Sequence, residues 1–155
     1  MFDYNMILID GTINLTATTD TPAIATDRDA ATGAAVIDLG PGGTPSNGLA
    51  AVLILPTAAV ASSTLTGFIE ASDTVDMTGT TTGISELGKF GVASATKGVI
   101  LAEEVVASTI PVIVVMRIAT EKRYIRANLT VNNTTGSYNF YKVKCYLTPF
   151  PFTLL

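Results

Sequence analysis

The apolar residues of this chain occur in short runs, several of which alternate with polar residues, and glycine, proline, asparagine or aspartate separates the runs. A period of two is typical of a β-strand with one buried face, whereas an amphipathic helix needs a period near 3.6. The clearest case is residues 124–131, where four apolar residues are predicted to share one face: Ile125, Ala127, Leu129 and Val131. The pattern therefore favours an all-β fold with little helix.

Ten runs are predicted to be strands: residues 5–8, 12–18, 35–39, 49–55, 64–71, 89–93, 99–102, 112–118, 124–131 and 138–147. Within the last run, Tyr138, Phe140, Lys142, Lys144 and Tyr146 are expected on a solvated face, opposite Asn139, Tyr141, Val143, Cys145 and Leu147. The chain has 155 residues, enough for one core but not for two ordinary domains. The runs predict a single-domain β-sandwich over residues 1–147, either a plain two-sheet sandwich or a jelly roll.

Long polar loops separate some of these runs. Residues 40–48 are rich in proline and glycine and are predicted to form a surface loop. This loop lacks the lysine of a phosphate-binding loop and leads into a strand, so phosphate binding is not expected there. Residues 17–33 and 74–83 are polar, and we expect them to become ordered only when another surface covers them.

The composition excludes several kinds of chemistry. Histidine is absent, which removes Ser-His-Asp hydrolysis and histidine-ligated zinc. The single cysteine, Cys145, forms no internal disulfide and is expected to be an inert thiol. The close pairs Asp27 with Asp29 and Asp73 with Asp76 lack the ligand pattern of an EF-hand and are typical of turns. We therefore expect no enzyme activity, no metal and no cofactor, and no apolar run is long enough to span a membrane.

Charge is distributed unevenly along the chain. Residues 1–104 carry three basic and twelve acidic groups (net −9), whereas residues 105–155 carry six basic groups and one acidic group (net +5), which together give −4. The basic groups include a cluster formed by Arg117, Lys122, Arg123 and Arg126. With an overall pI near 4.6 the chain repels phosphate, so a nucleic-acid partner is not expected. The cluster is predicted to bind an acidic protein surface or the acidic half of another copy; the alternative is a solvated strand end.

Residues 148–155 form an extended apolar C-terminal tail with no domain of its own. Its apolar residues are Phe150, Phe152, Leu154 and Leu155, and prolines at 149 and 151 are incompatible with a central strand. Terminal segments are normally polar, so this tail is predicted to be covered. It either folds back over its own sandwich as a lid or docks in a groove on a neighbouring subunit.

The order of these segments resembles that of the capsid cement, or decoration, proteins of tailed bacteriophages. The resemblance is carried by ILID at residues 7–10, AVIDLG at 35–40, LIL at 53–55, LTGFIEASD at 65–73 and KRYIRANLTV at 122–131. It covers roughly residues 6–147, and the ordered set carries it rather than any single motif. The loop from Gly40 and the tail after Leu147 depart from the family pattern.

The resemblance implies a jelly-roll sandwich on the outer surface of the virion, assembled in the host cytoplasm. Its partners would be the major capsid protein and further copies of itself, as a dimer or trimer, and it would stabilise the head without catalysis. One alternative is a carbohydrate-binding or adhesive sandwich of a head fibre or receptor-binding module, with Tyr138, Phe140 and Tyr146 exposed for stacking. Another is a small capsid subunit that forms a shell by itself.

Overall fold

The computed structural model describes residues 6–12, 14–15, 25–58, 64–77, 83–90, 99–101, 111–132 and 140–149. These residues form an all-β structure of antiparallel sheets with essentially no helix, which confirms the predicted class. The strands are β1 (Ile7–Asp10), β2 (Ile37–Asp38), β3 (Leu49–Leu55), β4 (Thr57–Ala58), β5 (Thr64–Ser72), β6 (Ser85–Phe90), β7 (Val99–Leu101), β8 (Val112–Ile118), β9 (Tyr124–Asn132), β10 (Phe140–Tyr141) and β11 (Lys144–Pro149). No helix in this part of the chain is both long and apolar enough to cross a membrane.

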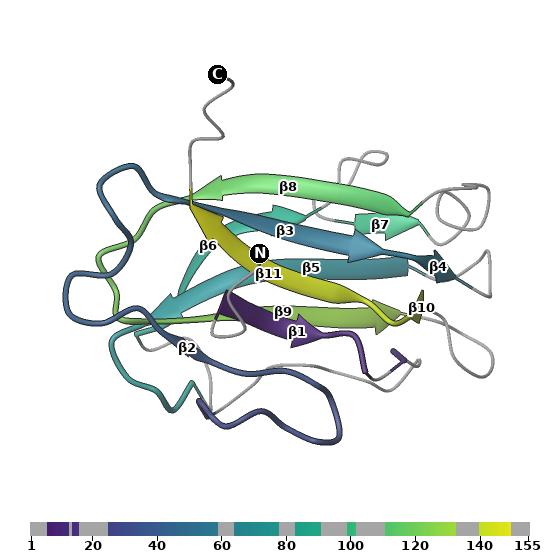
Figure 1. Cartoon of the computed structure of the whole chain (residues 1–155), viewed down its shortest axis with the longest axis horizontal. Helices are drawn as coiled ribbons and strands as arrows, with labels where there is room; N and C mark the ends of the chain where they lie inside the picture. Colours follow the sequence, from purple (N-terminus) through teal and green to yellow (C-terminus); the bar gives the residue numbers. More distant parts are fainter. Residues whose placement is uncertain are drawn as a thin grey trace.

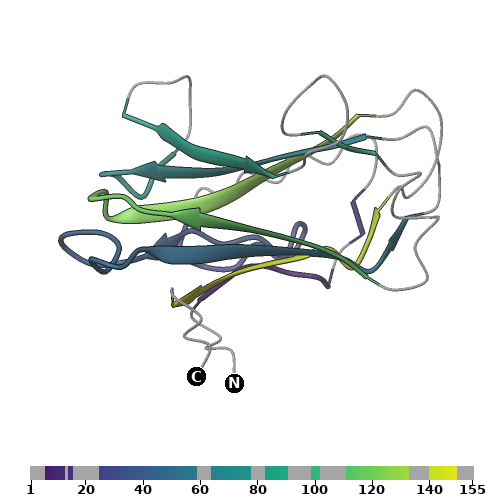
Figure 2. The same cartoon turned by 90° about the horizontal axis from the view of Figure 1, so that it is seen from above.

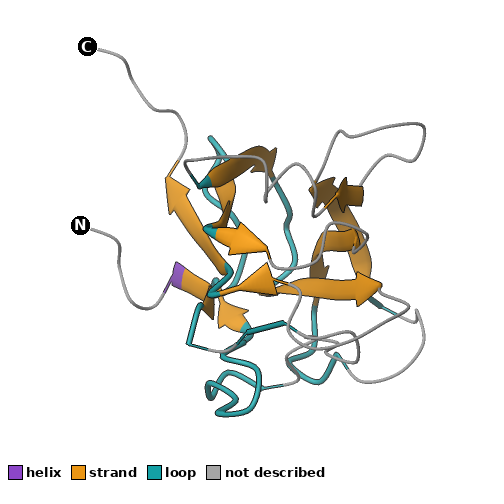
Figure 3. Cartoon of the chain, turned by 90° about the vertical axis from the view of Figure 1, so that its right-hand side faces the viewer, coloured by secondary structure: helices purple, strands orange, loops and turns teal. Residues whose placement is uncertain are grey.

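Two larger sheets face each other in a sandwich-like arrangement (Figures 1 and 2). The first sheet has the strand order β1-β11-β3-β8, and the second has the order β2-β9-β5-β6, with β7 also paired to β5. The strands β4 and β10 form a separate two-stranded pair. An end-on view shows the space between the two larger sheets (Figure 3). Side chains of both sheets fill it, including Leu53 of β3 and Ile69 of β5, neither of which is exposed at all.

The period-two pattern of β9 correctly predicts its buried face. Ile125, Ala127, Leu129 and Val131 are all buried, and β5 alternates in the same way against β9 across a continuous nine-residue register. The strand β3 is apolar on both faces because it lies inside the first sheet, between β11 and β8. The predicted bounds 49–55 and 112–118 agree with β3 and β8 at both ends.

The predicted strand 138–147 is wrong as one continuous element. Lys142 has a positive φ of 50°, which breaks the run into β10 and β11 and shifts the alternation by one residue. Phe140, expected on the solvated face with Lys142 and Lys144, is therefore fully buried. After the break the expected alternation holds: Lys144 is exposed, whereas Cys145 and Leu147 are buried.

Other strand ends also differ from the prediction. The strand β6 begins at Ser85, four residues before the predicted start. The prediction missed these residues because Ser85–Gly88 has no apolar alternation that would indicate a strand. Of the predicted strand 12–18, the described residues contain one isolated bridge, between Leu15 and Phe140. The strand β11 continues to Pro149, two residues into the segment predicted to be a tail, and there pairs with Leu49.

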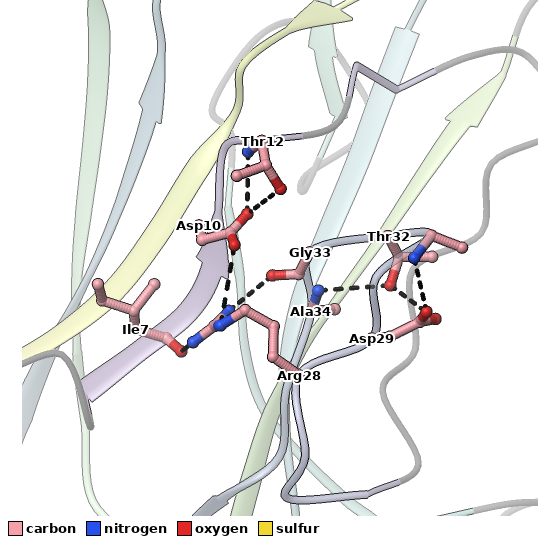
Figure 4. A network of polar contacts seen from close by, with 9 residues as sticks. Ile7, Asp10, Thr12, Arg28, Asp29, Thr32, Gly33 and Ala34 are labelled. Carbon is pink, nitrogen blue, oxygen red and sulfur yellow. Dashed lines mark hydrogen bonds and ion pairs between the residues drawn. The ribbon is translucent and has the colours of Figure 1, made fainter.

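Residues 25–36 are held against β1 by Arg28 (Figure 4) and by backbone hydrogen bonds, from Asp10 N to the carbonyl oxygen of Gly33 (3.1 Å) and from Ala35 N to that of Leu8 (2.9 Å). Arg28 donates from Nη1 to the carbonyl oxygen of Gly33 (2.6 Å) and from Nη2 to that of Ile7 (2.7 Å), and its Nε lies 3.8 Å from Asp10 Oδ2. Asp29 accepts bonds from Ala31 N and Thr32 Oγ1, so its carboxylate shapes a turn. We expected loop 17–33 to be covered by another surface, and its described residues, 25–33, are covered by β1 of the same chain.

Candidate docking surface

The tail and most of the predicted basic cluster originate at the same end of the sandwich. Pro149, the last described residue, pairs with Leu49, and Leu49 pairs with Ile118 on its other side. Ile118 ends β8, and the turn from β8 to β9 follows directly. The chain therefore leaves β11 next to the β2–β3 loop (residues 39–48) and the β8–β9 turn (residues 119–123), which we together call the loop end (Figure 1, left).

Backbone and side-chain bonds lock the two segments of the loop end to each other. Thr44 donates from N and from Oγ1 to the carbonyl oxygen of Thr120 (2.8 and 3.1 Å), and Thr120 N donates back to Thr44 Oγ1 (3.0 Å). Gly43 has a φ of +71°, and a Cβ at this position would overlap the backbone of Thr120 and Glu121. Only glycine fits there without strain. The predicted surface loop is therefore attached to the β8–β9 turn by hydrogen bonds and close packing.

A groove of about 410 Å³ lies at the loop end, between the β2–β3 loop and the start of β1. Its apolar lining comes from Met6, Leu39, Pro41, Pro45 and Leu49. Because Leu49 is also the register partner of Pro149, the groove adjoins the point where the tail begins. The loop end thus offers both an apolar groove and polar backbone to a partner.

The exposed cations of the cluster bind acids from the first half of the chain. Lys122 Nζ lies 3.1 Å from Asp73 Oδ2 and donates to the carbonyl oxygen of Gly83 (2.9 Å). Arg123 donates from Nε and Nη2 to the two carboxylate oxygens of Asp38 (2.8 and 2.7 Å). The acidic partners of these two basic residues thus lie in the same chain. The partner acids Asp73 and Asp38 were not predicted from the sequence, although the net charges of −9 on residues 1–104 and +5 on residues 105–155 were the signal for them.

Arg126 does not share an exposed surface with the other three residues. It lies on the outer face of the second sheet, is 5% exposed, and donates from Nε to Glu70 Oε2 (2.8 Å), its register partner on β5. Arg117 belongs to the first sheet and donates from Nη2 to the carbonyl oxygen of Asn47 (3.2 Å). The prediction of a single four-residue patch is therefore corrected: Lys122 and Arg123 share the β8–β9 turn, and Arg126 is a buried structural residue.

Asp38 and Arg123 form a two-bond ion pair beside the loop end, with side chains 35% and 47% exposed. The two bonds from Arg123, together with the backbone N–H of Gly40, lower the pKa of Asp38 to about 2. The same carboxylate raises the pKa of Arg123. The guanidinium carbon of Arg123 also lies 5.0 Å from the centre of the Tyr124 ring. These contacts orient the exposed Arg123 side chain toward Asp38 and Tyr124.

An exposed apolar row that was not predicted from the sequence lies on β8. Ile113 is 58% exposed and Val115 is 51% exposed, whereas Val112, Val114 and Met116 on the other face are partly buried against the core. The alternating exposure along β8 follows the pleat of the strand. In β3, the outward neighbours of Val115 and Ile113 are Val52 and Ile54, which extend the apolar character of this face.

The remaining candidate residues from the sequence are a cysteine, an aromatic face and the tail. Cys145 is buried in the core, and burial raises the pKa of its thiol. Phe140 is buried and does not contribute to an exposed aromatic face, whereas Tyr146 is partly exposed. No three acidic or cysteine side chains gather there in a way that would hold a metal ion. The predicted tail residues Phe150, Phe152, Leu154 and Leu155, and also Tyr138, lie outside the described residues.

Comparison of the chain with models of known families, with curated proteins and with solved structures finds no match.

Proposed function

We propose that this protein is a non-catalytic cement protein that binds the outside of a tailed-phage capsid and bridges neighbouring major capsid subunits. The observation that carries the proposal is the loop end. There a polar surface held together by hydrogen bonds and an apolar groove adjoin the start of an apolar tail. Stable protein interfaces combine an apolar centre with a polar rim, and the loop end has both components.

The strand order supports a jelly roll, the fold that the family resemblance implies. Setting aside the separate β4–β10 pair and β7, which pairs only with β5, eight strands remain, and four of their six pairs are nested: β1 with β11, β2 with β9, β3 with β8, and β5 with β6. In order along the chain, the first strand pairs with the eighth, the second with the seventh, the third with the sixth and the fourth with the fifth. Rolling one long antiparallel hairpin into two sheets produces this nesting, and jelly rolls are common in viral shells.

A binding role also agrees with the environment of the charged groups. Glu70 and Asp38 are held by Arg126 and Arg123, and Asp73 by Lys122, so these carboxylates serve as structural ion-pair partners rather than as a general acid and base. Together with the lack of histidine and the buried Cys145, this favours attachment over catalysis. Because Phe140 is buried, an aromatic sugar-binding face on residues 138–146 is less well supported.

The proposal is tested by adding the purified protein to capsids of the phage that encodes it, after the native protein has been removed. We expect the full chain to sediment with the capsids, and the variant lacking Phe150–Leu155 to sediment with them poorly while remaining folded. The truncation starts at Phe150 because Pro149 belongs to β11. If the full chain stays in the supernatant, or forms shells by itself, the proposal is wrong.

A further inference from the structure

The strand β8 lies at the edge of the first sheet and has one strand partner in the described part of the chain. It pairs with β3 without interruption from Val112 to Ile118, and it forms the upper border of the sheet in Figure 1. Its other neighbour is β6 of the second sheet, which it approaches through a side chain: a Cβ on Gly88 would lie 2.7 Å from the sulfur of Met116. This contact crosses the sandwich and leaves the backbone edge of β8 without a ladder partner among the described residues.

The edge of β8 lacks the features with which proteins usually prevent edge pairing. Protected edges carry charges, prolines or bulges along their length. The register of β8 has no bulge, its one charged residue is Arg117 near the end, and Pro111 lies just before the strand. The outward side chains of the middle of the strand are the exposed Ile113 and Val115. A regular, apolar, seven-residue edge of this kind is suited to pairing with another strand.

We propose that two copies of this chain associate through β8, paired antiparallel about a twofold axis at Val114. The pairing joins the two first sheets into one continuous sheet. In this register Ile113 faces Val115 of the partner subunit, Val112 faces Met116 of the partner subunit, and Val114 faces its own equivalent. The interface is isologous, as in most homodimers. The proposal rests on the cement function, since it supplies the paired unit that would bridge capsid subunits.

The side chains of β8 favour a second copy of this chain as the pairing partner, and they also determine the register of the pairing. A second copy offers a strand of equal length with the same apolar row, so each exposed β-branched residue covers another; such cross-strand pairs stabilise a sheet. Shifting the axis to Val115 would place Ile113 opposite Arg117 of the partner subunit. With the axis at Val114, Arg117 instead faces Pro111 of the partner subunit, and the two arginines lie at opposite ends of the paired strands. Of the two registers, the one centred on Val114 therefore buries apolar residues against apolar residues.

The mass of the purified protein in solution tests the association. By light scattering we expect twice the chain mass of 16.1 kDa for the native protein. The double variant Ile113→Lys/Val115→Lys should have the mass of a monomer, because each new lysine would face another lysine across the axis. The control is Val75→Lys, which places one lysine on an exposed apolar residue away from β8, in the β5–β6 connection, and should remain a dimer. A native monomer, or a double variant that stays dimeric, would overturn the proposal.

Single cysteines test the register and do not depend on whether the lysine variants fold. Under mild oxidation Val114→Cys should form a disulfide between subunits, since directly opposed residues of antiparallel strands have Cα atoms about 4.5–5.5 Å apart. Val115→Cys is more exposed but faces Ile113 of the partner subunit, so it should crosslink at least ten times more slowly. Faster crosslinking at position 115 contradicts the proposed axis. None of these measurements uses capsids: a dimer that does not bind capsids contradicts the cement function alone, whereas a monomer that binds them contradicts the dimer alone.

Discussion

The buried ion pair between Arg126 and Glu70 provides a quantitative test of the fold. The Arg126 side chain is 6% exposed and that of Glu70 is 17% exposed, and the two residues are register partners on β9 and β5. Replacing arginine by methionine keeps the apolar stem but removes the cation. Glu70 then retains one long bond from Asn128 Nδ2 (3.4 Å) and a carboxylate that is mostly shielded from water.

Removing one partner of a fully buried pair costs about 3–5 kcal/mol. Because Glu70 is partly exposed, we expect Arg126→Met to lower the free energy of unfolding by about 2–3 kcal/mol, which for a domain of this size lowers the melting temperature by about 5–10 °C. The double variant Glu70→Gln/Arg126→Met removes both charges of the pair, so its stability should return to within about 1 kcal/mol of the native protein.

Urea denaturation of the native protein, both single variants and the double variant measures the coupling energy directly. Lys122→Met is the matched control: its partner Asp73 is 73% exposed, and such surface pairs contribute at most about 1 kcal/mol. The reasoning is refuted if Arg126→Met is no less stable than Lys122→Met, or if the double variant loses as much stability as the two single variants combined.

Three further predictions concern the loop end and the tail. The carboxyl of Asp38 should titrate near pH 2 by NMR, and its pKa should rise toward the ordinary 3.8 in Arg123→Gln. Since the folded state lowers this pKa, the stabilisation is complete above about pH 4 and is lost as the pH falls toward 2, a loss that Asp38→Asn should remove from the unfolding curve. Gly43→Ala should lower stability by at least about 2 kcal/mol, whereas Gly42→Ala, also at positive φ but with open space at its Cβ, should cost about 1 kcal/mol; equal losses would contradict the packing against Thr120. Deleting Phe150–Leu155 should leave a strand-rich circular dichroism spectrum and a cooperative melt, and loss of the melt would show that the tail is part of the core.

Most strand positions could be predicted from the sequence, because local alternation reports which face is buried. Residues 124–131 are of this kind, since the alternation at Ile125 and Leu129 fixes the orientation of that strand, whereas residues 49–55 were recognisable as a continuous apolar run that is buried on both faces. The prediction fails where the backbone conformation of one residue shifts the alternation of buried and exposed side chains by one position. Lys142 at positive φ moves Phe140 to the buried side, and no pattern of residue types marks that change.

The partners of the charged residues could not be predicted, since they depend on which strands become neighbours. Lys122 and Arg123 bind acids 49 and 85 positions away in the chain, and Arg126 binds an acid 56 positions away. The uneven distribution of charge indicated that acids and bases would meet. Only the register of β9 with β5 and β2 shows that they meet within one chain, and that Arg126 lies among buried residues rather than in a docking patch.

A cryo-EM reconstruction of the phage head that carries this protein tests the central claim most directly. We predict density for the sandwich on the outer surface, with the loop end and residues 150–155 against the major capsid protein. Copies should be joined along β8. Density inside the shell, density at a tail or fibre, or a sandwich that contacts the capsid through its opposite end would contradict the account.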